Sequence, residues 1–264
     1  TLSHNTQRVV EIGNESYVPM VTGEGGYMMY GYKAGYPLNA LWGFQYAGVW
    51  HSPEEYLRNE KAKTYISGAN GTNTCIGKPK YVDQDGDGAM TQNDLIYMGQ
   101  ADPYLYGGLQ NTFNIGNFNL SFYFNYSLGG KIYNYMEQWM AGSSRTNQYR
   151  RMLDGWHPVR NPEGDLPRAG AFARMLPSDL MLYDASFLRL KEVSLSYTFD
   201  LKKHVKWMKS ITVGLTGDNL WLLTGYTGYD PDVSTNSSDS ALRRVDIDAY
   251  PKARKVILNL NIRF

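Results

Sequence analysis

A loop rich in aspartate holds the residues of this chain whose types and spacing could do chemistry. From residue 83 to residue 94 it reads Asp-Gln-Asp-Gly-Asp-Gly-Ala-Met-Thr-Gln-Asn-Asp. Calcium takes six to eight hard oxygen ligands, and an EF-hand-type loop supplies them from positions 1, 3, 5, 7, 9 and 12. The spacing therefore predicts a Ca²⁺ site. Its predicted ligands are the side chains of Asp83, Asp85, Asp87, Thr91 and Asp94 and the carbonyl oxygen of Ala89.

Two residues of this loop bear on the predicted site. Gly88 occupies position 6, where the turn needs a residue without a Cβ atom. Asp94 stands at position 12, where a longer glutamate is usual. We expect no long helices beside the loop, so a bound ion would staple the loop rather than act as a catalyst or a sensor. The alternatives are an Asp-Gly turn without metal and a Mg²⁺ site.

The rest of the sequence offers no catalytic constellation. The four histidines (His4, His51, His157 and His204) are scattered, and neither a Gly-x-Ser-x-Gly nor a His-Glu-x-x-His motif occurs. Cys75 is the only cysteine, so a disulfide within the chain is excluded. The net charge of +1 gives no electrostatic case for nucleic acid. We therefore expect neither an enzyme nor a nucleic-acid-binding protein.

Several segments alternate apolar and polar residues with the period of a β-strand. The clearest is 118–128, eleven uncharged residues, which is about the length that a tilted strand needs to cross a bilayer. A tight turn at Gly116-Asn117 joins it to a strand over 105–115. Further strands are predicted over 188–199, with a β-bulge near Lys191, over 211–221 and over 255–264.

The connections between these strands alternate in length. Those at 116–117 and 200–209 are short, whereas 13–103, 129–185 and 223–254 are long. Outer-membrane β-barrels have short turns on one side and long loops on the other. The predicted fold is therefore all-β and antiparallel, with five strands and a stub near the N-terminus. Because eight strands are the usual minimum for a barrel, others must come from elsewhere.

Helices are predicted only inside the long connections. The first begins at Ser52-Pro53-Glu54-Glu55, which has an N-cap, a proline at N1 and a capping-box glutamate. The second is predicted over 132–140, and 14–36 is interpreted as loop. A transmembrane helix is excluded, because the sequence has no run of about 18 apolar residues.

With these motifs in hand, the chain resembles the C-terminal part of a SusC/RagA-like TonB-dependent outer-membrane transporter. Phe264, the last residue, resembles the insertion signal of Gram-negative outer-membrane barrels. The segments that carry the resemblance are 83–88, 99–104, 117–122, 129–133, 184–191, 218–220, 228–233 and Phe264.

The resemblance implies a 22-stranded barrel in the Gram-negative outer membrane, with an N-terminal plug driven by TonB. It also implies a SusD-like surface lipoprotein that covers the barrel as a lid and delivers oligosaccharides or peptides. Residues 1–264 would then be a C-terminal segment of the barrel, with 13–103, 129–185 and 223–254 as extracellular loops and 255–264 as the terminal strand. Trp50, Trp139, Trp156 and Tyr229 are candidate contacts to substrate or lid, the alternative being packing among the loops.

A second class of protein fits part of the pattern. A soluble extracellular β-sandwich that binds glycans, with a calcium-stapled loop, would also need strands and the aspartate-rich segment. The uncharged, phenylalanine-rich strand and the one-sided loops disfavour it. The choice depends on whether lipid or a second protein layer covers Phe118, Phe122 and Phe124.

Overall fold

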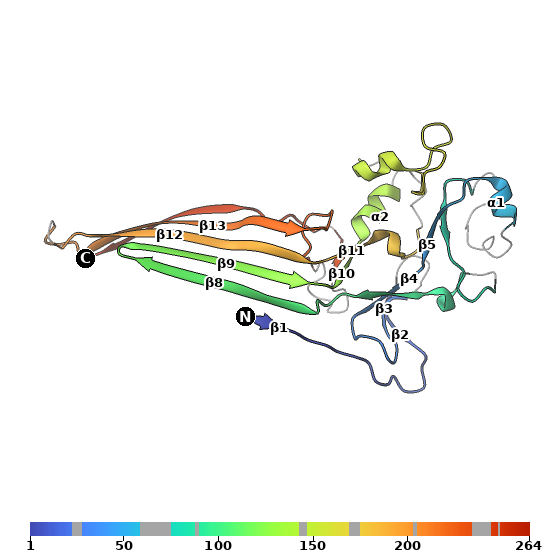
Figure 1. The fold of residues 1–264 in the computed structure, drawn as a ribbon, viewed down its shortest axis with the longest axis horizontal. Helices are drawn as coiled ribbons and strands as arrows, with labels where there is room; N and C mark the ends of the chain where they lie inside the picture. Colours follow the sequence, from blue (N-terminus) through green and yellow to red (C-terminus); the bar gives the residue numbers. More distant parts are fainter. Residues whose placement is uncertain are drawn as a thin grey trace.

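The computed structural model describes residues 1–22, 28–58, 75–87, 90–142, 147–168, 175–202, 205–233, 244–247 and 249–264. Antiparallel strands predominate and the helices are few and short, as predicted. A long sheet extends from one side of a cluster of folded loops (Figure 1). Within the described residues, no helix is long and apolar enough to cross a membrane.

The long sheet has the predicted five strands and a stub. Its strand order is β1-β8-β9-β12-β13-β15, and all neighbours are antiparallel. The strands are β1 (Leu2–Ser3), β8 (Leu105–Ile115), β9 (Phe118–Leu128), β12 (Phe187–Asp200), β13 (Ser210–Thr224) and β15 (Lys255–Arg263).

Local sequence signals set the turns of this sheet. Gly116 has φ of 58° in the β8–β9 turn, a left-handed conformation that glycine adopts without steric cost. The register of β12 shifts between Leu190 and Glu192 against both neighbours, which confirms the bulge. The short turns and the C-terminus lie together, at the end of the sheet away from the loop cluster (Figure 1).

The two faces of the sheet differ in polarity. On one face, Phe113, Leu120, Leu195, Leu215 and Leu258 lie side by side across the five long strands. Of these, Phe113, Leu195, Leu215 and Leu258 are 47–73 % exposed. On the opposite face the hydroxyls of Ser194 and Thr216 are hydrogen-bonded at 3.0 Å, and those of Thr198 and Thr212 at 2.9 Å. The sheet is therefore apolar on one side and polar on the other.

The three long connections fold into small sheets and helices rather than irregular loops, which corrects the interpretation of 14–36 as loop. The described strands there are β2 (Val18–Thr22), β3 (Met28–Tyr32), β4 (Ala40–Gly43), β5 (Tyr46–Val49), β6 (Pro79–Tyr81), β7 (Ile96–Gln100), β10 (Lys131–Asn134), β11 (Leu182–Asp184) and β14 (Val245–Asp246). They pair in the orders β2-β3-β4-β7, β5-β6 and β11-β10-β14. Several of these pairings, such as β4 with β7 and β10 with β14, join segments far apart in the chain, and all nine strands have five residues or fewer, too few to show a clear alternation.

The helices of the loop cluster are short. They are α1 (Pro53–Arg58), α2 (Tyr135–Gly142) and the 3₁₀ helices η4 (Gln92–Asp94), η5 (Arg150–Asp154) and η7 (Asp179–Met181). The predicted Ser52 N-cap of α1 forms, because the Glu55 amide donates to Ser52 Oγ at 3.1 Å, whereas the Glu55 carboxylate accepts from the His51 amide at 3.0 Å and not from the Ser52 amide of a capping box. The helix predicted over 132–140 is only half right, since Ile132 belongs to β10 and is fully buried.

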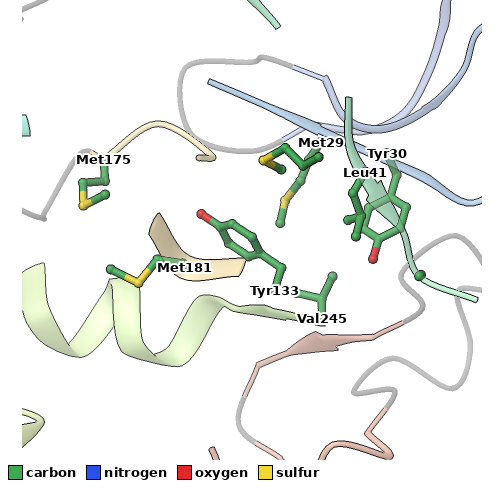
Figure 2. Close-up of a cluster of buried hydrophobic side chains, with 9 residues drawn as sticks. Met29, Tyr30, Leu41, Tyr133, Met175, Met181 and Val245 are labelled. Carbon is green, nitrogen blue, oxygen red and sulfur yellow. The ribbon is translucent and has the colours of Figure 1, made fainter. Parts of the chain in front are cut away.

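The main hydrophobic core lies in the loop cluster. Met29 and Tyr30 of β3 and Leu41 of β4 meet Tyr133 of β10 and Val245 of β14, together with the buried Met175 and Met181 (Figure 2). These residues come from all three long connections. Burial of their apolar surface fixes the connections against one another, and so positions the candidate site.

Candidate functional site

Three carboxylates of the aspartate-rich loop converge, as the spacing predicted. One oxygen from each of Asp83, Asp85 and Asp87 lies within 4.8 Å of the others. Hydrogen bonds from main-chain amides to the carboxylates hold the loop in this shape: the Gly86 amide donates to Asp83 Oδ1 at 2.6 Å and the Asp87 amide to Asp85 Oδ1 at 3.1 Å. The donors are all hard oxygens, the type that Ca²⁺ and Mg²⁺ prefer. The arrangement therefore fits a divalent cation.

Asp94, predicted as the ligand at position 12, accepts hydrogen bonds from two main-chain amides of the loop. It is fully buried; its Oδ1 accepts from the Gln84 amide at 2.8 Å, and its Oδ2 accepts from the Thr91 amide at 2.7 Å. Thr91 Oγ1 in turn accepts from the Asn93 amide at 3.1 Å and caps η4. The Asp94 side chain thus ties the end of the loop to its start, whereas the Thr91 side chain caps η4 within the end. That Asp94 and Thr91 also bind metal stays a prediction. Gly88 and Ala89 lie outside the described residues.

The four aromatic residues predicted as substrate or lid contacts differ in their surroundings. Trp139 and Tyr229 are 61 % and 65 % exposed. Trp156 is half-buried, and its Nε1 donates to the Pro162 carbonyl at 2.9 Å. Trp50 is 1 % exposed and packs against Cys75, with Lys80 Nζ 5.2 Å from its ring centroid. Trp50 therefore lies in the loop packing, whereas Trp139 and Tyr229 are on the surface.

The structure brings together a buried ionic cluster that the sequence reasoning did not single out. Arg189 is 3 % exposed and Asp230 is 2 % exposed, and Arg189 Nη2 lies 2.6 Å from Asp230 Oδ1. Arg189 Nη1 also donates to Asn219 Oδ1 at 2.7 Å. Lys252 Nζ lies 3.6 Å from Asp230 Oδ2. The cluster joins β12, β13 and the segment after Thr224. The sequence feature that could have pointed to this cluster is Arg189, which stands between Leu188 and Leu190 in a predicted strand.

A second polar cluster holds α2 against the β11-β10-β14 sheet. Glu137 of α2 is 3 % exposed and accepts from Arg151 Nη1 at 2.9 Å and from the Tyr183 hydroxyl. Burial, and the hydrogen bond to Glu137, raise the pKa of Tyr183 to about 12. The Tyr226 hydroxyl donates to Asp246 at 2.6 Å. These groups are paired within the protein, and their geometry supports loop packing rather than acid–base chemistry.

Comparisons with known proteins bear on what this arrangement serves. No family model matches the chain. Over its whole length the chain is 29 % identical to TonB-dependent receptor P26 of Formosa agariphila. It is 27 % identical to the TonB-dependent receptor SusC of Bacteroides thetaiotaomicron, over 71 % of the chain and 18 % of SusC. The chain resembles the SusC/RagA-like TonB-dependent receptors.

This likeness extends to the fold. The structure of the RagAB peptide transporter matches the whole chain with a TM-score of 0.71 at 21 % sequence identity. The expected resemblance and the antiparallel β fold are therefore confirmed. The chain spans only 26 % of P26 and 26 % of the matched RagAB chain. The relatives are named as receptors and transporters, which are not enzymes.

Proposed function

We propose that this chain is part of the wall of an outer-membrane, TonB-dependent nutrient importer of the SusC kind. The observation that carries the proposal is the sheet with one exposed apolar face and one hydrogen-bonded polar face. An apolar surface of this extent is unfavourable in water, whereas a barrel strand turns its apolar side to lipid and its polar side to the lumen. In the described residues no second sheet lies over that face, which disfavours the β-sandwich alternative.

The sheet also needs further strands. Its edge strand β15 pairs with β13 on one side only, and its other edge has only the two-residue β1. A membrane requires every backbone polar group to be paired, so an open edge has to close against other strands. The relatives are about four times as long as this chain, which supports a longer complete protein. We propose that it has a 22-stranded barrel, a plug and a TonB-contacting segment.

The folded connections 13–103, 129–185 and 223–254 are proposed to lie outside the cell. They gather at one end of the sheet, opposite the short turns (Figure 1). A SusD-like lipoprotein lid would bind over them, and the exposed Trp139 and Tyr229 are the aromatic contacts best placed for it. The cargo would be peptides or oligosaccharides. RagAB, named as a peptide transporter, supports peptides.

Two adjacent residues test the membrane orientation. Leu195 lies on the apolar face and Ser196 on the polar face of β12. Arginine on the lipid face near the midplane costs about 2–4 kcal/mol, whereas lumen positions tolerate it. In the full-length protein, Leu195→Arg should strongly lower the amount of folded protein in the outer membrane, and Ser196→Arg should leave it near the wild-type level. The reverse order would contradict the proposal.

The aspartate-rich loop is proposed to bind a structural divalent cation, Ca²⁺ before Mg²⁺. Bound metal would offset the repulsion between the three converging carboxylates. Protease cleavage within 75–103 of the full-length protein should therefore rise when a chelator is added. Asp85→Asn with Asp87→Asn should produce the same cleavage without chelator, and the long strands should stay intact. Cleavage that chelator does not change would contradict a metal staple.

A further inference from the structure

A cavity of about 530 Å³ opens among the loops beside η5. Its lining combines hydrocarbon and positive charge. Ile76, Met152 and Leu153 supply the apolar part, and the indole of Trp156 is beside them. The guanidinium groups of Arg160 and Arg168 supply the positive charge of the lining. The aspartate-rich loop and the Arg189 cluster contribute no residue to this lining.

Main-chain hydrogen bonds hold the cavity walls in place. The Trp156 amide donates to the Leu166 carbonyl at 2.8 Å, and the Arg168 amide donates to the Gly77 carbonyl at 2.9 Å. Gly77 has φ of +74°, and a Cβ atom there would come within 2.6 Å of the Trp156 ring. The ring therefore packs directly on the glycine backbone. The walls do not have to be ordered by a ligand, which lowers the cost of binding.

A turn next to the cavity holds Arg160. His157 Nδ1 accepts from the amides of Val159 and Arg160, both at 3.1 Å. Asn161 closes the turn through reciprocal main-chain bonds with His157 at 3.0 Å and 3.1 Å. The imidazole nitrogen that faces the turn and the indole N–H of Trp156 thus already have partners within the protein.

The positive charge at the cavity is not neutralised within the described part of the chain. Neither Arg160 nor Arg168 forms an ion pair there, although Asp154, Glu163 and Asp165 belong to the same connection. Lys78, which lies outside the lining but near Arg168, also forms no ion pair among the described residues. Burial lowers the pKa of Lys78, and the nearby charge of Arg168 lowers it further. A negatively charged ligand would relieve this repulsion.

We propose that this cavity binds the C-terminal residue of a short peptide. The carboxylate would pair with Arg160 and Arg168, since the planar guanidinium matches carboxylate geometry. The apolar side chain would lie against Met152, Leu153 and Ile76. An acidic sugar shares the carboxylate, but its hydroxyl-bearing ring would lie against the hydrocarbon of Ile76, Met152 and Leu153, which offers those hydroxyls no partners. The lining therefore favours a peptide. This inference rests on the proposed import function and names its substrate class.

The test uses the full-length protein purified in detergent and isothermal titration calorimetry. The probe is N-acetyl-Ala-Ala-Leu with a free carboxylate, and its control is the same peptide with a C-terminal amide. The acid should bind more tightly than the amide. Arg160→Gln and Arg168→Gln should each weaken binding of the acid about tenfold, the usual effect of losing one charged hydrogen bond. Arg150→Gln removes the same charge from the same connection, outside the lining, and should change the affinity little.

Each other result overturns the peptide site. Equal binding of acid and amide, or loss of affinity in Arg150→Gln alone, would remove the role of the two lining arginines. Arginine-dependent binding of a glucuronic acid disaccharide, without binding of the peptide acid, would assign the cavity to acidic sugars instead. Uptake by cells is measured separately. If the peptide binds as expected but no TonB-dependent uptake of labelled peptide occurs, the import function fails and the binding site stands.

Discussion

Replacement of Arg189 by methionine should release the segment after Thr224 from the sheet. The substitution keeps most of the side-chain volume and removes the charge that faces Asp230. Because both partners are at least 97 % buried, the remaining carboxylate would be a buried, poorly compensated charge. Breaking a buried pair by removing one partner costs about 3–5 kcal/mol. Lys252, at 3.6 Å from Asp230, still offers partial compensation, so we expect about 3 kcal/mol.

Hydrogen exchange reports this local opening. At about 1.4 kcal/mol for each factor of ten, the loss corresponds to roughly 100-fold faster exchange of amides in 225–233. The measurement uses the full-length protein in detergent, with peptides from β9 as the internal reference. Exchange in β9 should change much less than exchange in 225–233.

Two companion variants separate the buried charge from simple loss of contacts. In Arg189→Met with Asp230→Asn, the buried charge is gone, and the asparagine oxygen can still accept the Asp232 amide bond of 2.8 Å. Exchange should therefore recover part of the way toward wild type. Lys252→Met removes a cation that is itself 44 % exposed, and should cost about 1 kcal/mol or less. If Arg189→Met leaves the exchange of 225–233 unchanged, the cluster does not hold this segment.

Three further predictions concern other parts of the fold. Asp94→Ala should destabilise the loop from 83 to 94 by about 2–4 kcal/mol, because two main-chain amides lose their acceptor; local proteolysis measures it, and unchanged cleavage would contradict the tie. Burial alone would raise the pKa of Glu55, but hydrogen bonds from Lys80 and the His51 amide lower it below its ordinary value of 4.5. The stabilisation that the ionised Glu55 gives the start of α1 is therefore present above pH 4.5 and is lost as the pH falls through the lowered pKa. In acid, hydrogen exchange at the His51 amide should speed up relative to its intrinsic rate. In Glu55→Gln this pH dependence should be absent. Gly116→Ala should destabilise the β8–β9 turn by about 1 kcal/mol, since φ there is 58°, whereas Gly225→Ala, with open space and no left-handed φ, should have little effect on thermal stability.

The long sheet was predictable because its determinants are local. Alternation between apolar and polar residues, the Gly116-Asn117 turn and the phase slip near Lys191 all lie within a few residues of the structure that they specify. The cap of α1 is equally local. For the candidate metal site, the spacing of Asp83, Asp85 and Asp87 was enough to predict that their oxygens converge.

The folded loop cluster depends on contacts that no local pattern encodes. Strands such as β3 and β10 are only five and four residues long, and they exist because other segments pair with them and a shared core buries Met29, Tyr30 and Tyr133. Asp94 looked like a ligand by its position, and only the structure revealed its hydrogen bonds to Gln84 and Thr91. Arg189 and Asp230 are separated by 41 residues, so their burial together was decided by the tertiary structure. The sequence by itself determined the alternating strands, because side-chain direction follows from the backbone repeat, whereas partners brought together by burial follow from the packing of the whole chain.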